Sequence, residues 1–321
     1  MIKLSVVIPT IGRKQELLNT IKDLSKQNLP RDKWECLIIT QSEIDIESLK
    51  EIAIKNSLQL KVFYSKQPNA SLARNIGLIE ASGDIVLFLD DDLIIENPNF
   101  LSNHLRHYIE KNICGVVGQV TDITKKVRND RHKWSYKKRV GWLYFPSNYN
   151  NEALVPNGGA GNISINKKMA IDTGGMDINY EKGAHREESD FCLRLTNKYG
   201  LMVYDPEASV IHIGANTGGC RTWGMNTGIH PLHHIIGEWY FILNGLKQRT
   251  IFIRDLHHHL AALFFRQIFN ERNRKNPFAI ILSVFKSVYG FVLSLPKVIT
   301  KPKTLDSLMN YNYKLIYSIK K

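Results

Sequence analysis

The segment 84–92, DIVLFLDDD, is a continuous apolar run that ends in three carboxylates. Its apolar residues, 85–89, have no polar face, which predicts a strand covered on both sides in the middle of a parallel sheet. Asp90, Asp91 and Asp92 would then follow the carboxyl end of that strand, where open α/β sheets bind ligands. Since three adjacent acids repel one another, a hard cation such as Mg²⁺ or Mn²⁺ would neutralise them and leave positions open for phosphate. For an acidic triplet considered alone, a solvated turn is an equal alternative.

Upstream of this segment the sequence alternates between apolar strands and helical patterns. Strands are predicted at 4–8, 35–40 and 60–64, and helices at 17–24, 46–56 and 71–81. Alternation of this kind predicts a parallel, doubly wound sheet whose loops gather at one edge. No GxGxxG motif follows the first strand and the sequence contains no GxxxxGK[ST] motif, so neither a Rossmann-type dinucleotide site nor a P-loop is expected.

Beyond the acids the pattern is less regular. The segment 125–149 has no clean period and is interpreted as a long surface loop near the active face. The segment 157–162 contains three glycines, which would either let backbone approach a ligand or form a plain turn. Further elements are expected as helices at 100–111 and 167–173 and as strands at 115–121, 163–165, 201–204 and 209–213.

Two polar features in this half have both a structural and a functional interpretation. Glu187, Glu188 and Asp190 begin a predicted helix, where acids stabilise the helix dipole by about 0.3–1 kcal/mol each. A carboxylate at this position could equally serve as a general base. His212 lies between apolar neighbours, as core histidines usually do, but it could also bind the suspected metal.

Charge is concentrated at the carboxyl end of the chain. The net charge is +13, and 43% of the 321 residues are hydrophobic, which is ordinary for a globular protein. The segment 247–321 holds 14 Lys and Arg against three acids, and such a basic tail binds either nucleic acid or anionic lipid. The four cysteines stand far apart and no secretory signal is recognisable, so a reduced, cytoplasmic location is expected.

Five separated motifs occur in the order found in one protein family. They are SVVIPTIGR at 5–13, SLARNIGL at 71–78, LFLDDD at 87–92, REESDFCLRL at 186–195 and VIHIG at 210–214. Over roughly its first two-thirds, the chain resembles the family 2 glycosyltransferases, which are inverting enzymes of the GT-A fold. The resemblance implies an α/β fold in which a mostly parallel central sheet is flanked by helices.

The resemblance also implies which residues bind the donor substrate, a nucleotide-diphosphate sugar. Pro9, Thr10 and Arg13 would border the base and ribose. Gln41 stands where the family commonly has an acid that pairs with the uracil ring. Arg74 would bring positive charge to the diphosphate and Asp90 would contact the ribose side. The further donor-binding positions are Asn69, Ser71 and Asp91.

The resemblance places the metal and the general base in different acidic clusters. Asp92, with Asp90 and His212 as further ligands, would bind Mn²⁺ or Mg²⁺ at the two phosphates. Glu188 would be the base, although it replaces an Asp common in the family, so Glu187 and Asp190 are alternatives. In an inverting transfer the acceptor hydroxyl attacks the anomeric carbon opposite the departing diphosphate. A carboxylate must therefore take the proton on one side while a cation stabilises phosphate on the other.

The last third is interpreted as a helical, basic, membrane-associated extension, 216–321. The catalytic domain would then be 1–215, in which 1–121 binds the nucleotide sugar and 122–215 supplies the acceptor side and the base. Asn276 and Pro277 are a good helix start for the apolar segment 278–295, whose polar residues fall on one stripe. A helix lying in the interface of an anionic membrane is preferred to one that crosses it, and packing on the catalytic domain is the alternative.

The sequence thus predicts a metal-dependent inverting glycosyltransferase, peripheral at the inner face of the cell membrane, that transfers a sugar to a hydroxyl of a lipid-linked or polysaccharide acceptor. A sugar nucleotidyltransferase of related fold is one alternative, but it would need a Gly-rich basic loop where this chain has only PTIGRK. A non-catalytic protein that binds nucleic acid through its basic tail is another. The long apolar helix suits lipid better, so nucleic acid is not an expected partner.

Overall fold

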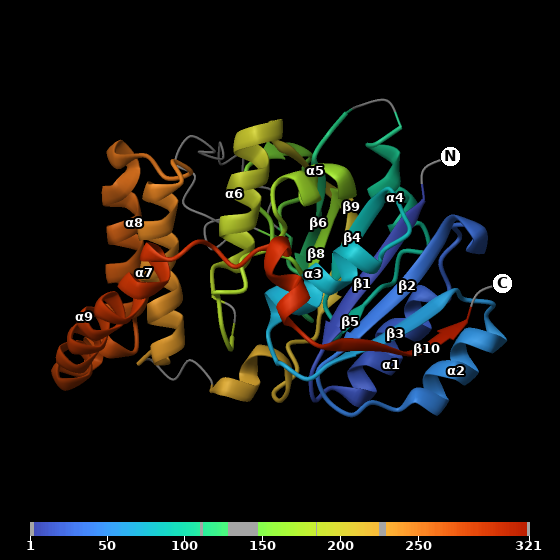
Figure 1. The fold of residues 1–321 in the computed structure, drawn as a ribbon, viewed down its shortest axis with the longest axis horizontal. Helices are drawn as coiled ribbons and strands as arrows, with labels where there is room; N and C mark the ends of the chain where they lie inside the picture. The colour runs from blue at the N-terminus through green and yellow to red at the C-terminus, as the bar shows by residue number, and fades with distance from the viewer. Residues whose placement is uncertain (1–2, 110–111, 128–146, 184, 225–228, 320–321) are drawn as a thin grey trace.

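The computed structural model describes residues 3–109, 112–127, 147–183, 185–224 and 229–319. Within these ranges one mixed sheet has the strand order β10-β3-β2-β1-β4-β8-β6-β9-β5, and β7 pairs with β9 (Figure 1). The strands are β1 (Leu4–Thr10), β2 (Trp34–Thr40), β3 (Leu60–Ser65), β4 (Ile85–Leu89), β5 (Leu93–Ile94), β6 (Gly115–Thr121), β7 (Ala153–Val155), β8 (Asn162–Asn166), β9 (Met202–His212) and β10 (Tyr313–Ile319).

The acidic triplet follows β4, which lies in the middle of this sheet. Every residue of β4 is buried, as its unbroken apolar run predicts, and the strand pairs in parallel with β1 and antiparallel with β8. Strands β1, β2 and β3 are also parallel to one another. The carboxyl ends of β1, β2 and β4 therefore lie at the same edge, and the loops that follow them converge there.

Helices cover both faces of the sheet. Apolar residues of α1, α2 and α4 join a buried cluster with Ile8 and Leu87 on one face. Residues of α3, α5 and α6 pack around Val7 and Phe88 on the other. The helices are α1 (Lys14–Leu24), α2 (Ile46–Lys55), α3 (Ala70–Glu80), α4 (Phe100–Arg106), α5 (Lys167–Asp172), α6 (Glu187–Tyr199), α7 (Leu232–Lys247), α8 (Leu256–Leu263) and α9 (Pro277–Ile299).

The structure differs from the sequence interpretation near the end of the sheet. The two strands expected at 201–204 and 209–213 form one strand, β9. Pro206 cannot donate to a strand ladder, and it is accommodated at an irregularity where the register between β6 and β9 shifts. Helix α4 ends at Arg106, earlier than predicted. Most of the surface loop predicted at 125–149 lies outside the described residues.

Helix α3 approaches β1 closely at Gly77. A Cβ at this position would overlap the Cγ methyl groups of Val7, which is fully buried in β1. Gly77→Ala is therefore expected to lower the free energy of unfolding by about 1–3 kcal/mol, as overpacked cores do. Gly159→Ala is the control, because a Cβ there meets no atom within 4 Å. Equal unfolding free energies for the two variants in chemical denaturation would contradict this close packing.

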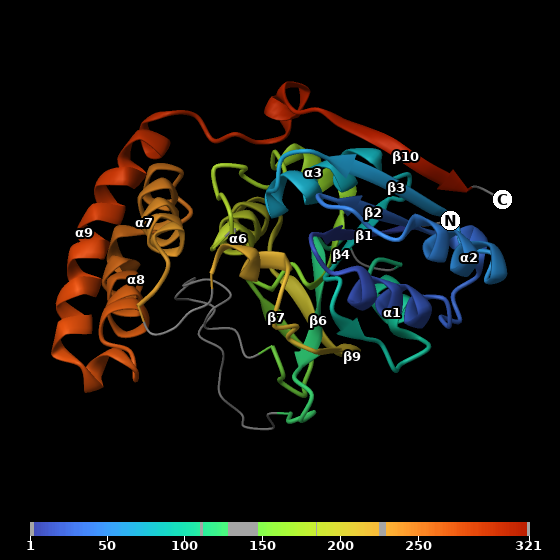
Figure 2. The same ribbon diagram turned by 90° about the horizontal axis from the view of Figure 1, so that it is seen from below.

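The carboxyl-terminal third forms a helical layer beside α6 and then returns to the sheet. Figure 2 shows α7 and α8 lying between α6 and α9, with α9 on the outside. Leu193 of α6 and Phe241 of α7 share one buried cluster, so this layer packs directly on the sheet domain. The sequence interpretation described 216–321 as a helical region and did not predict β10, which pairs antiparallel with β3 at the sheet edge. Its sequence, YKLIYSI, is rich in the apolar and aromatic residues that favour strands.

Candidate active site

Asp91 is fixed by residues of the loop that follows β1. Thr10 donates a hydrogen bond of 2.6 Å to one oxygen of Asp91, and Arg13 lies 2.8 Å from the other. Burial raises the pKa of Asp91 to about 6, although the positive charge of Arg13 opposes this rise. Arg13 also lies 3.0 Å from Asp92. Its guanidinium therefore balances part of the negative charge of the triplet, and it also lines the cavity beside it.

Asp90, Asp92 and His212 form a set of potential metal ligands. One ligand atom from each lies within 4.8 Å of the others. His212 reaches the triplet because it ends β9 and pairs with Leu93 of β5, the residue that follows Asp92. The buried Oδ1 of Asp92 lies 3.3 Å from Nε2 of His212 but accepts no hydrogen bond of good geometry in the described structure. Carboxylate oxygen and imidazole nitrogen suit Mn²⁺, and an incompletely satisfied buried oxygen is what a cation would complete.

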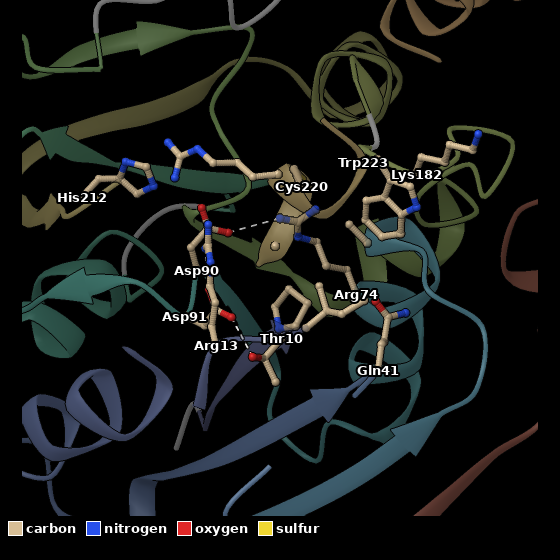
Figure 3. A pocket seen from close by; sticks show the side chains of 15 residues that line it. Thr10, Arg13, Gln41, Arg74, Asp90, Asp91, Lys182, His212, Cys220 and Trp223 are labelled. Atoms are coloured by element: carbon tan, nitrogen blue, oxygen red, sulfur yellow. Dashed lines mark hydrogen bonds and ion pairs between the residues drawn. The ribbon is translucent and has the colours of Figure 1, made fainter. Parts of the chain in front are cut away.

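Arg74 of α3 joins this cluster to the acids of α6. The side chain is only 5% exposed. Its Nη2 lies 3.4 Å from Asp90 and its Nη1 lies 3.2 Å from Glu187. Figure 3 shows the guanidinium directed at Asp90 across the cavity wall. Two acidic clusters that are remote in the sequence therefore meet at the guanidinium of Arg74.

The three acids considered as the base have different surroundings. Glu187 is buried against Arg74, and burial, together with the charge of Glu188, raises its pKa well above the usual range despite Arg74. Asp190 is buried and lies 2.8 Å from Arg194, one turn further along α6. Of the three, Glu188 alone is only half-buried. It is therefore the most exposed of the three.

A cavity of about 230 Å³ lies over these groups. In Figure 3, Asp90 and His212 lie on one side of it, and Lys182 and Trp223 on the other. The sequence-predicted residues that line it are Pro9, Thr10, Arg13, Gln41, Arg74, Asp90, Asp91 and His212.

Other predicted donor-binding residues are not in the wall of this cavity. Asn69 is 2% exposed; its side chain accepts a hydrogen bond from Leu72 N at the start of α3 and donates to the carbonyls of Ile178 and Tyr180. Ser71 is fully buried. The cavity is also not lined by Asp92, Glu187, Glu188 or Asp190.

The sequence interpretation missed one whole wall of the cavity. It is formed by the short helix η4 (Gly219–Trp223), which contributes Cys220, Arg221 and Trp223. Gly219 N donates to Ile11 O at 2.9 Å, which holds this segment over the loop after β1. Gly219 also has a φ of +51°, and a Cβ there would lie 2.7 Å from the guanidinium carbon of Arg13. The available signal was GGCRTW, where paired glycines precede Arg and Trp soon after VIHIG.

Comparison with solved structures identifies the class of fold. The TM-score to residues 1–349 of TarS from Staphylococcus aureus is 0.63 at 14% identity, with 95% of this chain and 83% of that chain covered. For the mannosyltransferase PcManGT from Pyrobaculum calidifontis it is 0.57 at 14% identity, with 96% and 79% covered. The chain therefore has the GT-A fold that the resemblance implied.

Sequence comparison identifies the family. Residues 5–175 match the family described as Glycosyl transferase family 2. This chain belongs to that glycosyltransferase family, as predicted. The poly(ribitol-phosphate) beta-N-acetylglucosaminyltransferase TarS of S. aureus is 30% identical over 95 residues, 29% of this chain and 16% of TarS. The GalNAc(5)-diNAcBac-PP-undecaprenol beta-1,3-glucosyltransferase of Campylobacter jejuni is 35% identical over 96 residues, 29% of this chain and 30% of that enzyme. The matches thus span under a third of either relative.

Proposed function

We propose that this protein is a metal-dependent inverting glycosyltransferase that uses a nucleotide-diphosphate sugar as donor. The observation that carries the proposal is the convergence of two acidic clusters on Arg74, beside a cavity lined by cationic and aromatic side chains. Donor binding is assigned to 1–121, and the base and acceptor side to 122–215. The end of β9 and η4 would complete the donor pocket from outside the first of these segments.

The donor diphosphate would lie beside the triplet. Asp90, Asp92 and His212 would hold Mn²⁺ or Mg²⁺, which supplies Lewis-acid stabilisation of the departing phosphate when bound. Arg74 and Arg221 would add positive charge, and Trp223 offers a ring on which a base or sugar could stack. In support, PcManGT is described in complex with GDP-Man and Mn²⁺, and TarS with UDP-GlcNAc.

Glu188 would perform the proton transfer. Its half-buried carboxylate would accept the proton of the acceptor hydroxyl while the oxygen attacks the anomeric carbon. The bond from that carbon to the phosphate oxygen would break on the opposite face, and the negative charge would pass to the nucleoside diphosphate.

The acceptor would be a lipid-linked or polymeric glycan. Support comes from the names of two relatives, one acting on poly(ribitol-phosphate) and one on a PP-undecaprenol glycan.

The donor assignment can be tested by thermal unfolding with a panel of nucleoside diphosphates and nucleotide sugars, each with Mn²⁺, Mg²⁺ or EDTA. We expect at least one to raise the melting temperature only when a divalent cation is present. Sugar nucleotides that stabilise the protein would then be tested for cation-dependent hydrolysis. No stabilisation by any nucleotide in the presence of Mn²⁺ would contradict the proposal.

The helix α9 would hold the enzyme at an anionic membrane surface. Within the described residues it alone is long and apolar enough to cross a membrane. Its small polar stripe, Ser283, Ser287, Gly290 and Ser294, is buried against the rest of the extension, where Ser287 accepts a hydrogen bond from Trp239 of α7. Most of its large apolar side chains are exposed, namely Phe278, Ile281, Val284, Phe285, Val288, Tyr289, Val292, Leu295 and Ile299.

Charge favours lipid as the occupant of this apolar face. Exposed Arg274 and Lys275 precede α9, and exposed Lys301 and Lys303 follow it. Each basic residue near an anionic surface contributes about 1 kcal/mol. Because its polar stripe packs on α7, the helix would stay attached to the protein while its apolar face lies in the membrane interface. Packing on the protein and binding to the membrane are therefore compatible.

Phe285→Glu combined with Val292→Glu is expected to abolish binding to phosphatidylglycerol-containing vesicles in a sedimentation assay. The wild type should sediment with these vesicles and not with neutral ones. Ile54→Glu is the matched control, since Ile54 is also an exposed apolar residue, 60% exposed, but lies on α2. Undiminished sedimentation of the double variant would contradict the proposal. So would a wild-type protein that binds no vesicles and instead forms a dimer that the double variant disrupts. Deleting 278–321 is unsuitable, because it also removes β10.

A further inference from the structure

The start of helix α6 has an unusual backbone. Arg186, the residue before Glu187, has φ +79° and ψ 1°, a left-handed backbone conformation that residues other than glycine rarely adopt. The side chain of Arg186 itself makes no capping hydrogen bond to this end of the helix. The first turn that carries Glu187 and Glu188 therefore depends on contacts outside α6 to keep its direction.

Those contacts come from α7 of the extension. Glu238 accepts hydrogen bonds from Nε of Arg186 at 2.9 Å and from Nη2 at 2.5 Å, so the carboxylate and the guanidinium form a bidentate pair. The guanidinium carbon also lies 4.8 Å from the ring centre of Phe241, one turn further along α7. Arg186 and Glu238 are 1% and 2% exposed. This is a buried, oriented ion pair, not a surface one.

The same carboxylate also holds the residue before Arg186. Nε2 of His185 lies 3.0 Å from Oε2 of Glu238. Burial alone would raise the pKa of Glu238, but the charge of Arg186 and the hydrogen bond from His185 keep it well below its usual range, so the group is ionised. At Gly237 the α7 backbone lies so close that a Cβ would be 2.6 Å from the carbonyl of His185. Consecutive residues before the base are thus held by α7.

We propose that Glu238 is a positioning residue for catalysis: through His185 and Arg186 it fixes the first turn of α6 and so directs Glu188 at the acceptor hydroxyl. This inference rests on the proposed function, which assigns the base to Glu188. It gives the helical extension a part in the chemical step as well as in membrane attachment. Both partners of the ion pair lie beyond residues 5–175, the segment that matches the family.

Glu238→Gln is the variant that tests the proposal, because the amide keeps the shape but cannot balance Arg186. We expect kcat for sugar transfer to fall by about 10²-fold, the cost of a displaced catalytic group, with the donor KM unchanged. Glu238→Asp, which retains the charge, should recover part of kcat. Asp172→Asn is the matched control: Asp172 pairs with Lys198 at the other end of α6, and its loss should change neither constant.

Amide hydrogen exchange gives a readout that does not need activity. Exchange at 187–190 is expected to accelerate in Glu238→Gln and to stay at the wild-type rate in Asp172→Asn. Unchanged exchange at 187–190 in Glu238→Gln, or an unchanged kcat in that variant, would overturn the proposal. If Glu238→Gln does not fold, Glu238→Asp is decisive, since it must show the same changes to a smaller degree. A wild-type protein that transfers no sugar would instead reject the proposed function, and the exchange result would still stand.

Discussion

Glu188→Gln is expected to lower kcat for sugar transfer by about 10²–10⁴-fold and to leave donor binding unchanged. The amide has nearly the same shape as the carboxylate but cannot accept the proton of the attacking hydroxyl. Glu188 is the half-buried member of the three acids at the start of α6, so the exchange should cost little stability. Steady-state kinetics with calorimetric titration of the donor would measure both quantities.

Glu187→Gln and Asp190→Asn distinguish the remaining candidates for the base. Glu187 is buried against Arg74, so its loss should weaken donor binding more than it lowers kcat. Asp190→Asn should destabilise the fold, because it leaves the largely buried Arg194 without its carboxylate partner. Full activity of Glu188→Gln together with an inactive, folded Glu187→Gln would transfer the role of base to Glu187.

Asp92→Asn is expected to remove cation-dependent transfer. Substitution of a residue that only orients a metal ligand lowers metal affinity or activity by roughly 10–100-fold. Substitution of a direct ligand should lower them at least as much. Asp92 is fully buried, and its pKa stays below the usual value because the charges of His212 and Arg13 outweigh burial, so it is ionised before any cation binds. Transfer would be measured over a range of Mn²⁺ concentrations.

Asp84→Asn is the control for this variant, since Asp84 is an acid that precedes the same strand at its opposite end. It should show the wild-type dependence on Mn²⁺. If Asp92→Asn showed that same dependence on Mn²⁺, the assignment of Asp92 as a metal ligand would be wrong.

The centre of the site could be predicted from the sequence because its parts lie in short, ordered motifs. A short, unbroken apolar run favours a covered strand, and in a parallel sheet the carboxyl end of that strand meets that of β1. Asp90 and Arg13 therefore had to lie near one another. His212 was more difficult, since its place depends on pairing with β5.

The remainder could not be predicted because it depends on contacts between distant segments. Trp223 and Cys220 reach the cavity through a turn that docks on Ile11, with no periodic signal. The polar stripe of α9 was recognised, but whether it faces water or protein depends on Ser287 meeting Trp239. Likewise, β10 is an edge strand only because β3 offers an unpaired edge.

In the proposed mechanism, two acidic clusters act on opposite sides of one bound donor. A crystal structure of the Glu188→Gln protein with Mn²⁺ and a nucleotide sugar, with anomalous data collected for manganese, would show whether they do. We predict a manganese peak beside Asp90, Asp92 and His212, with the diphosphate next to it and the sugar between it and residue 188. A nucleotide bound elsewhere, or a manganese ion away from the triplet, would contradict the claim.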